Sequence, residues 1–139
     1  MGLVLDTSVL IRAERKLLDL EDFLISRGDD VVGMAAVTAA ELLNGCYRAN
    51  GAGSRAIRLA FVEGLMDAVP VLPFGLPEAR LKAELWADLA KRGEVIAQQD
   101  MLVAATALAR GYELATLNRK AFGRVAGLRL AAIEEFETQ

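Results

Sequence analysis

The chain has 139 residues, a formal net charge of −3 and a hydrophobic share of 54%, which is typical of one globular domain, here residues 1–139. The sequence contains no histidine, which excludes histidine-dependent triads, histidine acid–base pairs and histidine-bound zinc. The acidic balance argues against a broad basic surface for long nucleic acids, but it allows a small basic rim around an acidic site.

Hydrophobic periodicity predicts strands that alternate with helices along the chain. The expected strands cover residues 2–5, 31–34, 69–72, 113–116 and 128–131. The expected helices cover residues 8–16, 19–27, 38–50, 54–68, 77–92, 98–110 and 119–122. This order predicts an α/β domain with a mostly parallel central sheet, flanked by helices and joined by right-handed crossovers.

Three local features refine this prediction. The helix at 77–92 is amphipathic, and its expected apolar side carries Leu81, Leu85, Trp86 and Leu89. Gly111 is expected to end the helix at 98–110 as a C-cap. The acidic tail at 134–137 is expected to be solvated.

Cysteine usage and hydropathy suggest a compartment. Cys46 is the only cysteine, which excludes an internal disulfide and favours a core position in a protein of the reducing cytoplasm. No charged-then-apolar leader precedes Asp6, and no stretch of about 18 uncharged apolar residues occurs. We therefore expect neither export by a signal peptide nor a membrane span.

Four oxygen-bearing side chains fall near the ends of expected elements. Asp6 follows the first strand, Glu41 and Asp100 lie early in helices, and Asn118 follows the fourth strand. Ligands of parallel sheets bind outside the carboxyl ends of the strands, so these side chains are expected to meet in one crevice. Converging carboxylates repel one another, and oxygen ligands without histidine favour Mg²⁺ or Mn²⁺.

Each position also has a purely structural interpretation. Asp6, Thr7 or Ser8 could cap the first helix. Residues 38–41 match a capping box. Asp100 could be a first-turn acid favoured by the helix dipole, and Asn118 could be an N-cap.

Four segments resemble the four motifs of PIN domains, especially those of the VapC-type toxin ribonucleases of bacterial toxin–antitoxin pairs. The segments are residues 3–11, 38–45, 96–107 and 115–122. The polar positions within them follow the family's order, 35, 59 and 18 residues apart. The resemblance spans nearly the whole chain and implies a PIN-like three-layer sandwich.

The resemblance further implies an endoribonuclease, the toxin of a type II toxin–antitoxin system, that hydrolyses RNA with a water activated by Mg²⁺ or Mn²⁺. The implied metal ligands are Asp6, Glu41, Asp100 and Asn118, with Thr7 and Thr116 as further catalytic candidates. Many PIN domains carry Asp where this chain has Asn118, so a second metal is expected to bind more weakly. A homodimer and a cognate antitoxin are also implied.

Basic residues near the expected site are candidates for contacts with RNA phosphates. They are Arg12, Arg15, Lys16, Arg119, Lys120 and Arg124. Each could equally be an ordinary solvated charge. A set of apolar residues could line a groove for an amphipathic antitoxin helix or belong to the core: Leu42, Leu43, Tyr47, Phe61 and Leu65.

Other functions compete with this hypothesis. A non-catalytic scaffold that binds RNA or protein through the same fold is favoured by Asn118. A phosphatase or phosphoacceptor domain with Asp6 as nucleophile would need a second Asp two residues later, where this chain has Ser8. Dinucleotide binding is disfavoured because no Gly-x-Gly-x-x-Gly follows the first strand.

Overall fold

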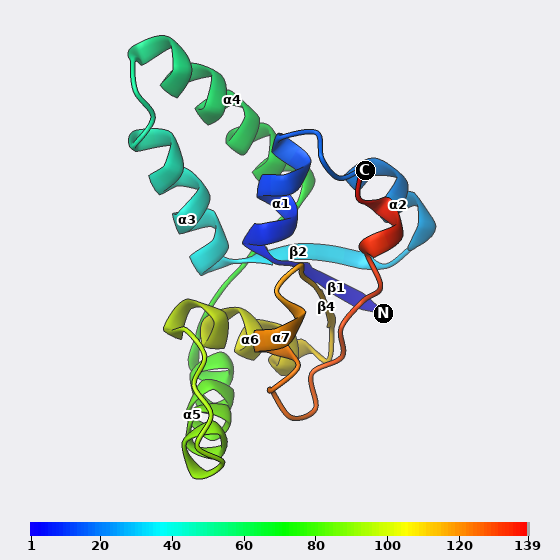
Figure 1. Cartoon of the computed structure of the whole chain (residues 1–139), viewed down its shortest axis with the longest axis vertical. Coiled ribbons are helices and arrows are strands. Elements are labelled where there is room, and N and C mark those ends of the chain that lie inside the picture. Colours follow the sequence, from blue (N-terminus) through cyan, green and yellow to red (C-terminus); the bar gives the residue numbers. More distant parts are fainter. Residues whose placement is uncertain (139) are drawn as a thin grey trace.

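The computed structural model describes residues 1–138, in which helices and strands alternate (Figure 1). The strands are β1 (Gly2–Leu5), β2 (Val31–Ala35), β3 (Val71–Leu72) and β4 (Glu113–Ala115). The helices are α1 (Thr7–Glu14), α2 (Leu20–Ser26), α3 (Ala36–Tyr47), α4 (Ala52–Ala68), α5 (Leu76–Lys91), α6 (Gln98–Arg110) and α7 (Arg119–Phe122). A 3-10 turn, η1, covers Glu134–Phe136.

The four strands form one sheet in the order β3-β2-β1-β4, and every pairing is parallel. The chain builds the sheet from β1 through β2 to β3 on one side and then returns to add β4 on the other side of β1. The strand order therefore reverses beside β1, which makes the carboxyl ends of β1 and β4 the expected place for a ligand.

Helices cover both faces of this sheet, which confirms the predicted α/β class and its flanked parallel sheet. Leu3 and Leu5 of β1 pack in one core cluster with α1, α2, α3 and α4, whereas Val4 packs in a second cluster with α5, α6 and α7. The split follows from the period of two in a strand, which turns successive side chains to opposite faces. Figure 1 shows the two helical layers on either side of the sheet.

Two glycines are required near the start of β4, one by backbone conformation and one by close packing. Gly111 has φ +68° and ends α6 in the left-handed conformation, so the predicted C-cap is confirmed. Gly2 begins β1 against the ring of Tyr112, and a Cβ at this position would overlap that ring. Both glycines help the strand β4 to lie directly beside β1.

The predicted strand at 128–131 is wrong as a regular strand. Only one parallel bridge, between Leu114 and Leu130, joins this segment to β4. Leu114 N donates to Arg129 O, and Ala131 N donates to Leu114 O, both at 2.9 Å. With a partner strand of three residues, the pairing ends after this bridge.

The helix expected at 38–50 begins earlier, at Ala36, and ends at Tyr47. Thr38 therefore lies inside α3, fully buried, and cannot cap its start. The capping-box interpretation of residues 38–41 is wrong for this reason.

One expectation about exposure is wrong and a second holds only in part. Trp86 is 49% exposed and lies under the Lys82 ammonium, 3.9 Å from the ring centroid, instead of packing with the buried Leu85 and Leu89. In the acidic tail Glu134 and Glu135 are exposed as expected, whereas Phe136 packs edge-on against Phe23 with ring centroids 5.3 Å apart. Within residues 1–138, no helix combines the length and the apolarity needed to cross a bilayer.

Replacement of Leu3 by Ala is expected to lower the free energy of unfolding by about 2–5 kcal/mol, because it removes a fully buried side chain from the central strand and leaves a cavity. Urea unfolding followed by circular dichroism measures the change. Ile25→Ala is the control, because Ile25 is 68% exposed and its loss should change stability by no more than about 0.5 kcal/mol. Equal effects of the two variants would contradict the assigned core.

Candidate functional site

Asp6 lies where β1 ends and α1 begins, with its backbone N–H bonded to Ala115 O at 2.9 Å. Its side chain is only 5% exposed and makes no capping bond to α1. Instead, Oδ2 accepts hydrogen bonds from Ser8 Oγ at 2.8 Å and from Thr116 Oγ1 at 2.7 Å. Asp6 occupies the N-cap position, but its carboxylate bonds two hydroxyl side chains and not the backbone N–H groups of α1.

The two hydroxyls that hold Asp6 are themselves fixed by the segment after β4. Ser8 Oγ accepts from Leu117 N at 3.1 Å, and Thr116 Oγ1 accepts from Asn118 N at 3.0 Å. Both hydroxyls bond the same carboxylate oxygen, and residues 1–138 supply no hydrogen bond to Oδ1 of Asp6. This leaves Oδ1 as the oxygen that can accept a bond from a ligand.

Glu41 reaches the same region from α3, which starts directly after β2. Thr7 Oγ1 donates to Glu41 Oε1 at 2.8 Å, and the buried Thr38 Oγ1 lies 3.1 Å from Thr7 Oγ1. Glu41 does not bond back to its own helix but to the residue that follows Asp6. The hydroxyl of Thr7 therefore links the first and second acidic positions.

Asp100 stands in the first turn of α6, half-buried beside the other two acids. Burial raises the pKa of its carboxyl above the ordinary value, and the negative charges of Asp6 and Glu41 raise the pKa further. Asn118 Nδ2 donates to Asp100 Oδ2 at 3.4 Å. Asn118 is the N-cap residue of α7 but makes no side-chain cap, so its amide faces the acids instead.

The donor set is that of a site for a hard cation. Three carboxylates with mutually unfavourable charges and one amide supply oxygen ligands and no sulfur or nitrogen, as Mg²⁺ and Mn²⁺ prefer. Within residues 1–138, however, no three Asp, Glu or Cys side chains are already placed to hold a metal ion together. Glu41 and Asp100 are instead bonded to Thr7 and Asn118, contacts that a ligand would have to replace.

A polar cleft of about 580 Å³ opens from this site between α1, α3, α4 and the start of α6. Thr7 and Glu41 line its acidic end. Its other lining residues include three arginines: Arg15 and Arg48 at the ends of α1 and α3, and Arg58 inside α4. The cleft is thus acidic at one end and basic at the other.

The basic residues predicted to contact RNA fall into two groups, those bonded within the fold and those that face solvent or a hollow. Arg12 pairs with Glu137, Arg119 pairs with Glu134 and donates to Ala131 O, and Arg124 donates to Val95 O. These contacts give the three side chains a structural role. Arg15 lines the polar cleft, and Lys120 is exposed next to Asn118. Lys16, with φ 60°, borders a separate hollow beside α2 and α4.

The apolar residues predicted to line a helix-binding groove differ in how exposed they are. Leu42 is buried in the core at 2% exposure, whereas Tyr47 and Phe61 are 63% and 39% exposed. Phe61 and Leu65 line the hollow of about 420 Å³ that Lys16 borders. Leu43 is partly buried against the core.

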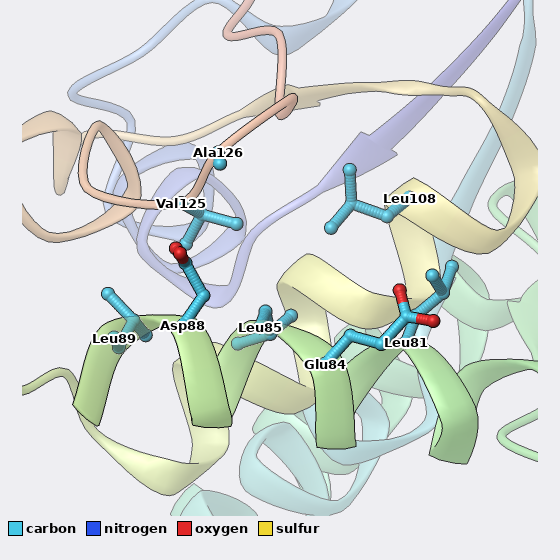
Figure 2. Close-up of a pocket in the computed structure, with 8 residues that line it drawn as sticks. All are labelled: Leu81, Glu84, Leu85, Asp88, Leu89, Leu108, Val125 and Ala126. Carbon is cyan, nitrogen blue, oxygen red and sulfur yellow. The ribbon is translucent and has the colours of Figure 1, made fainter. Parts of the chain in front are cut away.

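A further cavity, of about 270 Å³, lies in the other helical layer (Figure 2). Leucines of α5 and α6 and Val125 form its apolar wall, and the carboxylates of Glu84 and Asp88 point into it. Asp88 is paired with Arg92 at 2.7 Å. Its lining includes Leu81, Leu85 and Leu89 from the predicted apolar side of α5, but none of the four acidic and amide positions.

Sequence reasoning missed three contributors to the site. Ser8 was considered only as a helix cap, although it bonds Asp6. Thr38 was considered only as part of a capping box, although it lies against Thr7. Arg48 was not singled out, although it stands seven residues after Glu41, two turns further along the same helical face.

Comparison with known proteins identifies the family of the chain. A family model described as PIN domain matches residues 3–128. Ribonuclease VapC1 of Rickettsia felis is 38% identical over 133 residues, which cover 96% of this chain and 97% of that protein. The tRNA(fMet)-specific endonuclease VapC of Shigella flexneri is 29% identical over 97 residues, which cover 70% and 74%.

The fold has a close match among solved structures. A chain of VapBC-1 from nontypeable Haemophilus influenzae superposes with a TM-score of 0.84 at 25% identity, covering 94% of this chain and 97% of the other. The family model and the Rickettsia relative both span most of the sequence, which confirms the resemblance carried by the four motifs. The chain therefore belongs to the PIN domain family and, within it, to the VapC-type ribonucleases.

Proposed function

We propose that this protein is a Mg²⁺- or Mn²⁺-dependent endoribonuclease, the toxin of a type II toxin–antitoxin system acting on RNA in the cytoplasm. The observation that carries the proposal is the buried carboxylate of Asp6, which two hydroxyls orient toward the neighbourhood of Asp100 and Glu41. Membership of the VapC-type ribonucleases supports the nuclease class.

The four positions take different roles in this mechanism. Asp6 and Asp100 would hold the main cation, Glu41 would orient the attacking water, and Asn118 would complete the ligand set with its amide oxygen. When bound, the cation supplies positive charge to the phosphate and makes a coordinated water more acidic. The Asn118 amide would have to turn, because its nitrogen is directed at Asp100 in the structure.

The hydroxyl residues position these groups. Ser8 and Thr116 keep Asp6 Oδ2 engaged, so Asp6 presents Oδ1 in one orientation. Thr7 holds Glu41 at the mouth of the polar cleft, where a water could be aligned with the scissile phosphate. Attack by water in line with the leaving 3′ oxygen gives products with 5′-phosphate and 3′-hydroxyl ends.

The name of the Shigella relative gives the first RNA to test. That protein is described as specific for tRNA(fMet), whereas the Rickettsia relative is named only as a ribonuclease. Selectivity of this small site for one RNA would depend on the shape of RNA loops and on a few basic contacts. Initiator tRNA is therefore the first substrate to compare with total RNA.

A cognate antitoxin and a homodimer belong to the same proposal. The Haemophilus match is a VapBC structure, which supports a partner protein for this chain. The exposed Phe61, with Leu65 in the hollow beside α2, offers apolar surface that an amphipathic helix could cover. The homodimer would be tested by light scattering of the purified chain.

A catalytically weak or inactive RNA-binding or protein-binding scaffold is the second candidate. Asn118 favours it, because this residue supplies an amide where many PIN domains supply a fourth carboxylate. The Asn118–Asp100 hydrogen bond would then stabilise the protein without a cation. Metal binding without RNA cleavage would distinguish this candidate from the enzyme.

The purified chain is expected to cleave cellular RNA in Mg²⁺ or Mn²⁺ and to lose this activity in EDTA. Asp6→Asn should lower the rate at least about a hundredfold, because it removes a charge that holds the cation. Sequencing gels and end-labelling would measure the cuts and show 5′-phosphate ends.

Asp29→Asn is the matched control for this experiment, since Asp29 is exposed and lies in the turn before β2. The control variant should cleave as fast as the unmodified protein. Products with 2′,3′-cyclic phosphate ends would rule out attack by water.

Asp100→Asn is expected to raise the melting temperature of the metal-free protein at pH 7, because it removes the charge that burial, Asp6 and Glu41 disfavour. The raised pKa means that the folded wild type takes up a proton at higher pH than an ordinary Asp. The advantage of the variant should therefore shrink as the pH falls. Calorimetry from neutral to acidic pH would measure this.

The same variant should no longer gain stability from Mg²⁺. A ligand at 100 times its Kd stabilises the folded state by about 2.7 kcal/mol, so wild type should show a clear rise in melting temperature. An equal rise in Asp100→Asn would remove Asp100 from the cation site, whatever the RNA assay shows.

Asn118→Asp is expected to tighten Mn²⁺ binding by at least about tenfold, because a fourth carboxylate adds a full charge near the ion. The same change should destabilise the metal-free protein, since it replaces a donor to Asp100 with a like charge. Titration calorimetry would give the affinity, and thermal unfolding in EDTA the stability. Unchanged affinity would place residue 118 outside the ligand set.

A further inference from the structure

The three arginines of the polar cleft differ in their partners. Arg58 donates to both carboxylate oxygens of Glu14, at 3.0 and 3.1 Å, and to Gly45 O at 3.1 Å, so its charge is used within the fold. Within residues 1–138, Arg15 and Arg48 form no ion pair and no side-chain hydrogen bond, although both line the cleft. Two guanidinium groups thus face the cleft with unused donors.

Their places in the fold are equivalent. Arg15 is the C-cap residue of α1 and Arg48 the C-cap residue of α3. Figure 1 shows both helices beginning at the sheet and running away from it. The rise of about 1.5 Å per residue puts Arg48 about 10 Å beyond Glu41, and Arg15 about 12 Å beyond Thr7. Both arginines therefore mark the end of the cleft remote from the acids.

The charge pattern of the cleft selects its occupant. A strand of nucleic acid repeats one negative charge per nucleotide, at about 3.4 Å when stacked, so 10–12 Å corresponds to roughly three nucleotides. A phosphate at the acidic end requires a cation, whereas a phosphate at the basic end requires a guanidinium. Arginine provides a planar fork of donors that matches a phosphate.

We propose that Arg15 and Arg48 form a phosphate-binding subsite that grips single-stranded RNA roughly three nucleotides from the scissile bond. This subsite deepens the proposed ribonuclease function and rests on it for the identity of the strand. It sets the direction of the RNA along α1 and α3, away from the basic segment that follows β4. Arg12, Arg119 and Arg124 do not belong to it, because the fold already uses their donors.

Binding of a labelled, unstructured RNA oligonucleotide tests the subsite. The measurement uses the full chain in an Asp6→Asn background, which prevents cleavage, with fluorescence anisotropy over a range of salt concentrations. Each of Arg15→Ala and Arg48→Ala should raise the Kd about tenfold. The double variant should make the slope of log K against log salt concentration shallower by about 1.4, because each of two lost contacts to a single strand contributes about 0.7.

Arg80→Ala is the matched control, because Arg80 is an exposed arginine of α5 that does not line the cleft. This variant should leave both Kd and salt slope at the wild-type values. An equal loss in Arg80→Ala and in the two cleft variants would mean a general effect of net charge and would overturn the subsite. Unchanged binding in the double variant would overturn it as well.

Cleavage kinetics separate the subsite from the chemistry. In the wild-type background, the double variant should raise KM for a long oligonucleotide much more than it lowers kcat. The rise in KM should disappear when the RNA is shortened to a dinucleotide that cannot reach the arginines. An equal rise in KM for both substrates would contradict the proposed distance between the arginines and the scissile bond.

The outcomes distinguish this inference from the proposed function. If the unmodified chain binds RNA in an arginine-dependent way but never cleaves it, the subsite stands and the ribonuclease fails. If the chain cleaves RNA and the double variant does so with unchanged KM, the ribonuclease stands and the subsite fails. Loss of a co-expressed antitoxin from the double variant, with unchanged RNA binding, would assign the arginines to a protein interface and overturn the proposal.

Discussion

The carboxylate of Asp6 is the group on which the rest of the site depends. A charge that is 5% exposed is unfavourable unless hydrogen bonds replace its water, and Ser8 and Thr116 supply two of them. These bonds also connect the chain after β1 with the chain after β4, which the sequence separates by 110 residues. The Asp6 N–H bond to Ala115 O fixes the two strand ends in register. One buried acid therefore lies at the point where the strand order of the sheet reverses, and it joins the two strand ends that meet there.

The remaining acids are held close to Asp6 against their mutual repulsion. Asp100 is affected most, because burial and the charges of Asp6 and Glu41 all raise the pKa of its carboxyl. Thr7 and Asn118 partly compensate by donating hydrogen bonds to Glu41 and Asp100. The proposed cation would offset this repulsion on binding, since a ligand that binds only the folded state stabilises that state.

The pairing of charged side chains also explains the charge pattern of the cleft beside the acids. Most arginines near the site have partners in the fold, as Arg58 has in Glu14 and Arg119 in Glu134, and these pairs brace one element against another. Arg15 and Arg48, at the ends of α1 and α3, differ because their donors have no partner among the residues that the structure describes. Two helices that both start at the sheet thus carry acids or hydroxyls near their first turns and cations at their last residues. Because both helices run away from the sheet, the cleft between them is acidic near the sheet and basic at its far end.

The sequence by itself determined the α/β class, most element positions and the four polar positions, because hydrophobic periodicity and strand-end polar residues are local signals. It misplaced what depends on distant neighbours. Residues 128–131 form only a bridge because β4 is short, and Trp86 is exposed because the α5 surface it shares is not covered by another element within residues 1–138. Only the tertiary structure decided that Ser8 and Thr116 share one oxygen of Asp6, and which arginines keep unused donors. Those outcomes depend on side chains that meet across more than 30 residues of sequence, and no local pattern encodes such a meeting.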